Sequence, residues 1–158
     1  MREKIDCFLP CHDFEDLRST VSDLMENNTT RHVHLLVGSD FNDTLLPEDI
    51  DCIYTSSPFS TQTIKEMAEH TDADFVMIST KSTPVEFGEH ALERLLRVAA
   101  DSDAAMVYCD HYSMIDGIKE KHPVTDYQKG SIRDDFDFGQ IILLPALYLH
   151  EYASTGIN

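Results

Sequence analysis

Strand-like and helix-like segments alternate along most of this 158-residue chain, and this alternation restricts the possible folds more than any other feature. Five short apolar segments typical of strands each end in a polar loop, and helical patterns separate most of them. This order predicts a mostly parallel sheet covered by helices. Ligands of such sheets bind beside the carboxyl ends of the strands, so the five loops outline a candidate site. The loops are Pro10-Cys11-His12, Gly38-Ser39, Thr55-Ser56, Thr80-Lys81-Ser82 and Asp110-His111-Tyr112.

Local signals indicate where several helices begin. Asp13 and Ser60 each precede a stretch with helical apolar spacing, and both residue types are favourable N-caps. Thr83 followed by Pro84 predicts the start of a long helix that carries an apolar stripe as far as Ala99, because proline is well tolerated at the first helical position. The strand segments are expected at 5–9, 32–37, 51–54, 74–78 and 104–108.

The pattern changes after the fifth strand segment. Asp116-Gly117 is typical of a two-residue hairpin turn and lies between two extended segments, which predicts one antiparallel hairpin near 106–124. An apolar run at 141–144 follows, and Pro145 opens a last helix that ends near Tyr152. We therefore expect a single α/β domain over residues 1–158, built as a three-layer αβα sandwich around a mostly parallel mixed sheet.

Composition excludes several classes of function. The formal net charge of −17 argues against a nucleic-acid-binding surface, which needs clustered lysine and arginine. No apolar run approaches the ~20 residues of a membrane span, and the N-terminus lacks the apolar core of a signal peptide, so we expect a cytoplasmic location. Neither C-x-x-C nor H-E-x-x-H occurs, which argues against zinc bound through those motifs.

Three stretches carry a resemblance to a known family. The first strand ends in proline and a short polar segment, the fourth follows an acidic turn, and the fifth leads into a Tyr-x-Asp segment and the hairpin. These stretches are Ile5–Asp13, Thr71–Ile78 and Val107–Gly117. In order and spacing they resemble the nucleotide-sugar-binding half of family 2 inverting glycosyltransferases, which have the GT-A, or nucleotide-diphospho-sugar transferase, fold. The resemblance implies sugar transfer from a nucleotide diphosphate sugar to an unknown acceptor, with Mg²⁺ or Mn²⁺ on the diphosphate.

The resemblance also implies a set of donor-binding residues at the strand ends. The chain departs from the family after the fourth strand. The family has an Asp-x-Asp-type metal pair there, whereas Ser79–Thr83 of this chain has no carboxylate. Lys81 is then expected to bind the diphosphate without metal, with a solvent-exposed loop lysine as the alternative. Asp110 is the candidate metal ligand, with a hydrogen-bonded turn as the alternative. The implied donor-binding residues are Pro10, Cys11, His12, Ser39, Asp40, Lys81, Asp110 and His111.

The family's catalytic base lies well beyond the hairpin, so the resemblance places it after Asn158, in a downstream part without which this chain would be inactive. Two other functions stay open. The missing acidic pair favours a non-catalytic GT-A-like module that binds a partner domain. A sugar nucleotidyltransferase-type domain would have a Gly-rich, Arg/Lys-bearing loop after the first strand, and Pro10–Asp13 has none. Arg133-Asp134-Asp135 could contact a phosphate or a sugar, although a surface ion pair is the commoner explanation.

Overall fold

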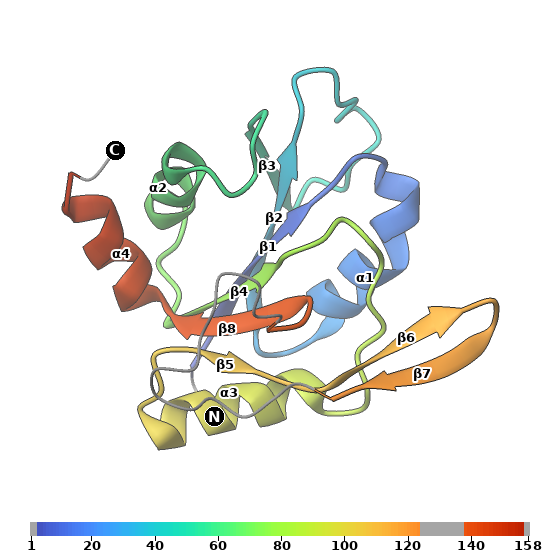
Figure 1. Ribbon diagram of the computed structural model, residues 1–158. Coiled ribbons are helices and arrows are strands. Elements are labelled where there is room, and N and C mark those ends of the chain that lie inside the picture. The colour runs from blue at the N-terminus through green and yellow to red at the C-terminus, as the bar shows by residue number, and fades with distance from the viewer. Residues whose placement is uncertain (1–2, 124–137, 157–158) are drawn as a thin grey trace.

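A computed structural model describes residues 3–123 and 138–156 of the chain. Its main sheet has six strands in the order β3-β2-β1-β4-β8-β5, and β6 and β7 form a separate two-stranded sheet (Figure 1). The strands are β1 (Ile5–Pro10), β2 (Thr30–Val37), β3 (Ile50–Tyr54), β4 (Phe75–Ser79), β5 (Val107–Tyr108), β6 (His111–Ile115), β7 (Ile118–His122) and β8 (Ile141–Pro145). The helices are α1 (Phe14–Glu26), α2 (Thr61–Glu69), α3 (Ala91–Ser102) and α4 (Ala146–Ser154).

Most of the main sheet is parallel. Strand β1 pairs in parallel with both β2 and β4, and β2 pairs in parallel with β3. Strand β8 runs antiparallel between β4 and β5, so that Leu143 faces Met77 on one side and Val107 on the other. Because β8 is antiparallel to both neighbours, β5 points in the same direction as β1 to β4. The predicted mostly parallel mixed sheet is confirmed, and the apolar run at 141–144 forms an antiparallel strand within it.

Helices cover both faces of the sheet and complete the three predicted layers (Figure 1). Each face has its own buried apolar cluster, which is where most of the stabilising apolar burial lies. Helices α1 and α3 contribute to the cluster on one face through Phe14, Leu17, Val21, Leu24, Leu92, Leu96 and Ala99. Helices α2 and α4 contribute to the other through Met67, Ala68, Ala146 and Leu149. The α/β sandwich predicted from the sequence is therefore confirmed.

The predicted helix starts are confirmed at two positions and wrong at the third. Asp13 accepts a hydrogen bond from the Glu15 amide (3.0 Å), and Ser60 caps α2 in the same way. Helix α3 begins only at Ala91, not at Pro84. The buried Thr20 hydroxyl of α1 explains the difference, because it accepts from the Val85 amide (2.9 Å) and lies 3.0 Å from the Val85 carbonyl. These bonds hold the segment after Pro84 against α1, and tertiary contact overrides local preference.

The hairpin forms at the predicted turn. Asp116 and Gly117 both have positive φ (50° and 77°), which is the conformation that an Asp-Gly hairpin turn requires. The hairpin does not join the main sheet, and the expected strand at 104–108 shrinks to Val107–Tyr108. Residue 124, the expected end of the hairpin, lies outside the described residues. Among the described helices, none has both the length and the apolar character to cross a membrane.

Candidate functional site at the carboxyl edge of the sheet

The carboxyl ends of the parallel strands form one continuous edge, as the sequence predicts. Backbone hydrogen bonds extend the strand pairing past the strand ends, from the Cys11 amide to the Leu36 carbonyl (2.9 Å) and from the Thr55 amide to the Val37 carbonyl (2.8 Å). Antiparallel β8 starts at this edge, where the Thr80 amide donates to the Gln140 carbonyl (2.8 Å). The structure therefore brings the predicted loops to one side of the sheet and adds the start of β8 between them.

The loop after β1 exposes only part of its predicted set. Pro10 is buried, and Cys11 is 2 % exposed within the α1/α3 apolar cluster. Burial is the main cause that raises the pKa of the Cys11 thiol to about 11, with nearby Cys52 and Asp13 adding to it. His12 is exposed, and Asp13 already serves α1 as its N-cap. Of these residues, His12 is the one that offers a side chain to a ligand at the surface.

The loop after β2 is acidic and turns back toward β3. Ser39 and Asp40 are exposed, and Asp40 lies over Gly38, where an added Cβ would come within 3.0 Å of the Asp40 Oδ1. Tyr54 donates a hydrogen bond to the Asp43 carboxylate (2.6 Å), and that bond is the first cause that raises the pKa of Tyr54 to about 12. This loop thus places hydroxyl and carboxylate groups at the ends of β2 and β3.

Gln140 organises the loop that carries Lys81. Its amide nitrogen donates to the Thr83 carbonyl (2.7 Å) and the Ser79 hydroxyl (3.2 Å), while its amide oxygen accepts from the Thr83 hydroxyl (3.0 Å). The Ser79 hydroxyl in turn donates to the Lys81 carbonyl (2.8 Å). The Lys81 side chain is exposed, and no ion pair of this side chain occurs within the described residues. The backbone at Lys81 is therefore held while its ammonium group faces solvent.

The same segment also contacts the end of β5. Gly139 has a positive φ of 82°, and a Cβ added to it would lie 3.2 Å from the His111 Nδ1 and 3.5 Å from the Cys109 carbonyl oxygen. Glycine therefore allows residues 139–140 to pass between the Lys81 loop and the loop of Asp110 and His111. Asp110 is exposed and His111 is half-buried. Sequence reasoning missed Gly139 and Gln140, since nothing local distinguishes them from a loop before an apolar run.

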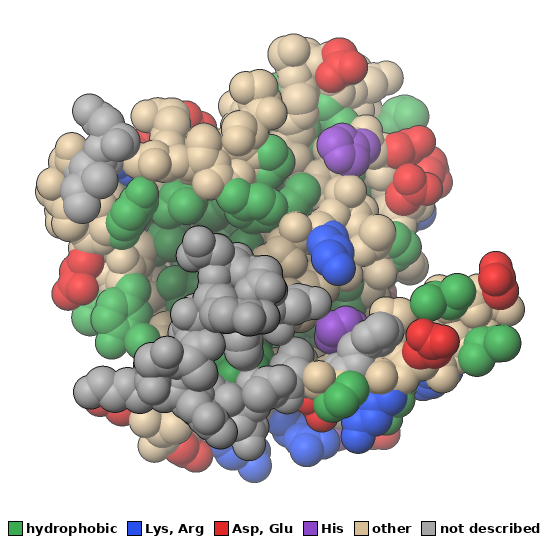
Figure 2. All heavy atoms as spheres, in the orientation of Figure 1, with side chains coloured by type: hydrophobic (Ala, Val, Ile, Leu, Met, Phe, Trp, Pro, Cys, Tyr) green, Lys and Arg blue, Asp and Glu red, His purple; other side chains and the backbone are tan. Residues whose placement is uncertain are grey.

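On the face drawn in Figure 2, histidine and basic side chains are spread singly among other atoms, with acidic side chains to one side. Within residues 3–123 and 138–156, this edge does not bring three metal-ligating side chains together, because the single such group lies at the other end of the strands. The candidate Arg133-Asp134-Asp135 falls outside the described residues. At this edge the described residues offer a single loop cation, Lys81, and scattered carboxylates such as Asp40 and Asp110.

No protein-family model matches the chain, and no curated protein matches it in sequence. Two solved structures are similar to it in fold. One is the crystal structure of 4-diphosphocytidyl-2C-methyl-D-erythritol synthase, at 12 % identity and a TM-score of 0.55, with 99 % of this chain and 82 % of that chain covered. The other is the CMP:2-keto-3-deoxy-manno-octonic acid synthetase complexed with CTP, at 10 % identity and a TM-score of 0.58, with 98 % and 79 % covered.

Both similar structures are nucleotidyltransferases with a nucleotide-diphospho-sugar transferase-like fold. At these identities the likeness shows the fold alone. It bears out the fold implied by the sequence resemblance but does not single out family 2 glycosyltransferases.

Proposed function

We propose that this chain is a nucleotide-binding domain of the nucleotidyltransferase type, in which the carboxyl edge of the sheet binds a nucleoside triphosphate. The observation that carries the proposal is the fold likeness to two nucleotidyltransferases over 98–99 % of the chain. One of these was solved with CTP bound, which makes CTP the first nucleotide to test. This function was the second alternative that the sequence left open, and it takes precedence here over glycosyl transfer.

The chemistry asks for positive charge at the phosphates. In nucleotidyl transfer an acceptor oxygen attacks the α-phosphorus and pyrophosphate leaves, so groups that neutralise the departing charge lower the barrier. The loop after β1 supplies no such cation, because Pro10–Asp13 contains neither arginine nor lysine. Lys81, on a loop held by Gln140, is the group that we assign to this role.

A divalent metal is compatible with the same edge. Mg²⁺ is usually bound by one or two carboxylates together with substrate phosphates and water, rather than by a complete protein cage. Asp110 is exposed at the end of β5 and could supply one carboxylate, as the sequence predicts. Lys81 and a metal at Asp110 could contact the phosphates at the same time. Measuring nucleotide binding with and without a chelator separates the contribution of the metal from that of Lys81.

Glycosyl transfer from a nucleotide diphosphate sugar would use the same edge but a different reaction. It would release a nucleoside diphosphate and need a base, which we expect after Asn158, whereas nucleotidyl transfer releases pyrophosphate. The two proposals therefore differ in the product to be measured.

Titration calorimetry of CTP, UTP, GTP and ATP, each with Mg²⁺ or with EDTA, tests the proposal directly. We expect CTP to bind, and Lys81→Ala to weaken binding by about tenfold to a hundredfold, the range for loss of one charge-assisted contact. Lys4→Ala is the matched control, because Lys4 is exposed at the opposite edge of the sheet. Lys4→Ala should leave the affinity unchanged.

The outcomes separate the parts of the proposal. Absence of binding by any nucleoside triphosphate, with nucleotide sugars bound instead, would contradict the nucleotidyltransferase type. Binding that requires Mg²⁺ and is equal in Lys81→Ala and the unmodified chain would keep the function but assign the phosphate contact to the wrong residue.

A further inference from the structure

The amino edge of the same sheet carries a second group of functional side chains. Neighbouring strands place Asp6 of β1, His32 and His34 of β2 and Asp51 of β3 at adjacent positions, since Asp6 is in register with His32 and His34 with Asp51. Residues at i and i+2 of a strand point to the same face, so His32 and His34 share one face of β2. None of these side chains belongs to the nucleotide-binding edge, and the inference from them is independent of the proposed function.

His34 is the unusual member of this group. Its side chain is 2 % exposed, and within the described residues neither ring nitrogen has a hydrogen-bond partner. The ring stacks on Phe8 with centroids 4.7 Å apart, and the Asp51 Oδ2 lies 3.8 Å from the Nδ1. Buried polar side chains are rarely left unpaired, so an imidazole in this state indicates a missing ligand.

Asp6 is fully buried and held in one orientation. Its carboxylate accepts hydrogen bonds from the Thr71 hydroxyl (2.7 Å), the Arg31 guanidinium (3.0 Å) and the His32 amide (3.1 Å). The ligand atoms offered by Asp6, His32 and His34 all lie within 4.8 Å of one another. Two ligands of one tetrahedral metal ion are about 3.4 Å apart, given bonds of ~2.1 Å. Closing the three groups onto an ion therefore needs only small side-chain movements.

We propose that Asp6, His32 and His34 form a binding site for a divalent transition metal ion of the Zn²⁺ class. Two imidazoles and one carboxylate suit Zn²⁺ and its neighbours, whereas Mg²⁺ and Ca²⁺ prefer oxygen ligands throughout. The three ligands come from two adjacent strands, and Asp6 and His32 are 26 residues apart in the sequence. Motifs of close spacing such as C-x-x-C or H-E-x-x-H therefore do not reveal this site.

The positive charge of Arg31 is balanced within the group. Its guanidinium contacts the Asp6 Oδ2 at 3.0 Å and the exposed carboxylate of Asp72 at 3.6 Å. Asp51 adds another carboxylate beside His34, so the group as a whole has three carboxylates and one guanidinium. The site therefore has a net negative charge before an ion binds. The Asp6 Oδ1 accepts a hydrogen bond from the His32 amide, while the Arg31 and Thr71 bonds go to the Oδ2. The Oδ1 therefore keeps a lone pair for a metal.

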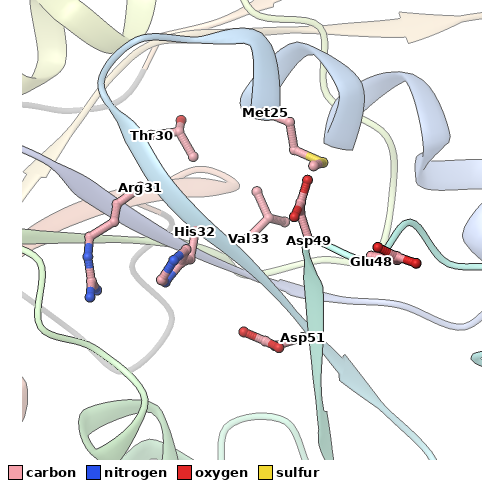
Figure 3. Close-up of a pocket in the computed structure, with 8 residues that line it drawn as sticks. All are labelled: Met25, Thr30, Arg31, His32, Val33, Glu48, Asp49 and Asp51. Atoms are coloured by element: carbon pink, nitrogen blue, oxygen red, sulfur yellow. The ribbon is translucent and has the colours of Figure 1, made fainter.

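An open cleft borders the site at His32. Its volume is about 480 Å³, and His32, Arg31 and Asp51 are among the residues that line it. Figure 3 shows the His32 ring and the Asp51 carboxylate on one side of β2, with Asp49 and Glu48 on its other side. The cleft thus exposes His32 to a cation from solvent, while Asp6 and His34 are buried and do not line it. Ligand type and orientation are features expected of a real metal site.

Zinc titration of the untagged full chain tests the proposal. After treatment with EDTA and buffer exchange, we expect one equivalent of Zn²⁺ to bind by calorimetry, and one of Co²⁺ to give the visible absorption of a tetrahedral site. His32→Ala is the main variant, because His32 is exposed and its loss should not prevent folding. It should weaken Zn²⁺ binding at least tenfold and abolish the Co²⁺ absorption. His150→Ala removes an exposed histidine of α4 as the matched control and should change neither.

A second variant tests the buried ligand. His34→Gln keeps a polar side chain of similar length, and with folding checked by circular dichroism it should also lose the Co²⁺ absorption. Failure of the unmodified chain to bind Zn²⁺ at millimolar concentration would overturn the proposal. Equal Zn²⁺ affinities of His32→Ala and His150→Ala would also overturn it, since binding would then occur elsewhere. Mg²⁺ that competes with Zn²⁺ at equal concentration would contradict the assigned class of metal.

Discussion

The two edges of the sheet position their side chains by different means. At the carboxyl edge the candidate groups stand on loops, and Lys81 is placed by the bonds that Gln140 makes to its loop. At the amino edge Asp6 and His32 stand on paired strands, in register with each other. A loop can adapt to a large, flexible, phosphorylated ligand, whereas a strand pair holds atoms within the short distances that a metal needs. One sheet can therefore support two kinds of site.

The edges also differ in how their charges are used. The amino-edge carboxylate of Asp6 is fully buried and bonded to three donors, so its loss affects folding. The carboxyl-edge ammonium of Lys81 is exposed, so its loss should affect binding alone. This contrast predicts large stability effects at one edge and small ones at the other.

Replacing Asp6 should produce the largest effect. Asp6→Ala removes the buried acceptor of the Arg31 guanidinium and of the Thr71 hydroxyl, and we expect a loss of about 3 kcal/mol in the free energy of unfolding. Urea denaturation in EDTA measures this loss without any contribution from a bound metal. Asp72→Ala is the control, since Asp72 is 91 % exposed and its contact with Arg31 should contribute less than about 1 kcal/mol. Similar losses in both variants would show that burial of Asp6 is not what distinguishes the amino edge.

Replacing Gln140 should have an intermediate effect that is confined to the carboxyl edge. Gln140→Ala removes the bonds to Ser79 and Thr83, and we expect a loss of about 1–2 kcal/mol in the free energy of unfolding. Hydrogen exchange should accelerate at the amides of residues 79–83, because the loop loses its support. Gln62→Ala breaks a Gln62–Glu66 bond on the exposed side of α2 and should cost only about 0.2–0.5 kcal/mol. Unchanged exchange at 79–83 would mean that the backbone alone holds the Lys81 loop.

Cysteine alkylation should show the smallest effect and reports on opening of the carboxyl edge. Cys109 is exposed, while burial raises the pKa of Cys11 to about 11 and that of Cys7 to about 12. A raised pKa keeps the thiol protonated, so at pH 8 only about 10⁻³ of Cys11 is thiolate, the reactive form. Iodoacetamide followed by peptide mass spectrometry should therefore modify Cys109 first and Cys7 and Cys11 only in urea. As long as the pH stays below the pKa of Cys11, each rise of one pH unit should increase the labelling rate of Cys11 about tenfold. Equal labelling of Cys11 and Cys109 in the folded chain would show that the carboxyl edge opens.

Sequence patterns predicted elements wherever the deciding contacts are local. Asp13 and Ser60 cap helices through the residues that follow them, and Asp116-Gly117 turns because its own backbone can adopt positive φ. The predicted helix start at Thr83-Pro84 was wrong because the Val85 amide bonds to the Thr20 hydroxyl instead of entering a helix. Thr20 lies 65 residues away from Val85, so no local pattern indicates this bond. The site residues follow the same division. Lys81 was visible as a cation after a strand, whereas the role of Gln140 depends on contacts with residues 57–61 positions away.

The amino-edge group shows where a partial signal was present. His-x-His within a strand places two imidazoles on one face, and this spacing can be read from the sequence. The third ligand cannot, because Asp6 meets His32 only through the register of β1 against β2. A shift of one residue in that register would turn the Asp6 side chain to the other face of the sheet.

The class of fold follows from the chain's own pattern, since alternating apolar segments can bury their faces only by stacking helices on a sheet. Tertiary structure alone decided that the apolar run at 141–144 inserts antiparallel between β4 and β5, because an apolar run carries no information about its partners. It also decided which polar groups meet at each edge, through strand register and through side chains such as Gln140 and Thr20. Such pairings join residues far apart in the chain, and local preference cannot encode them.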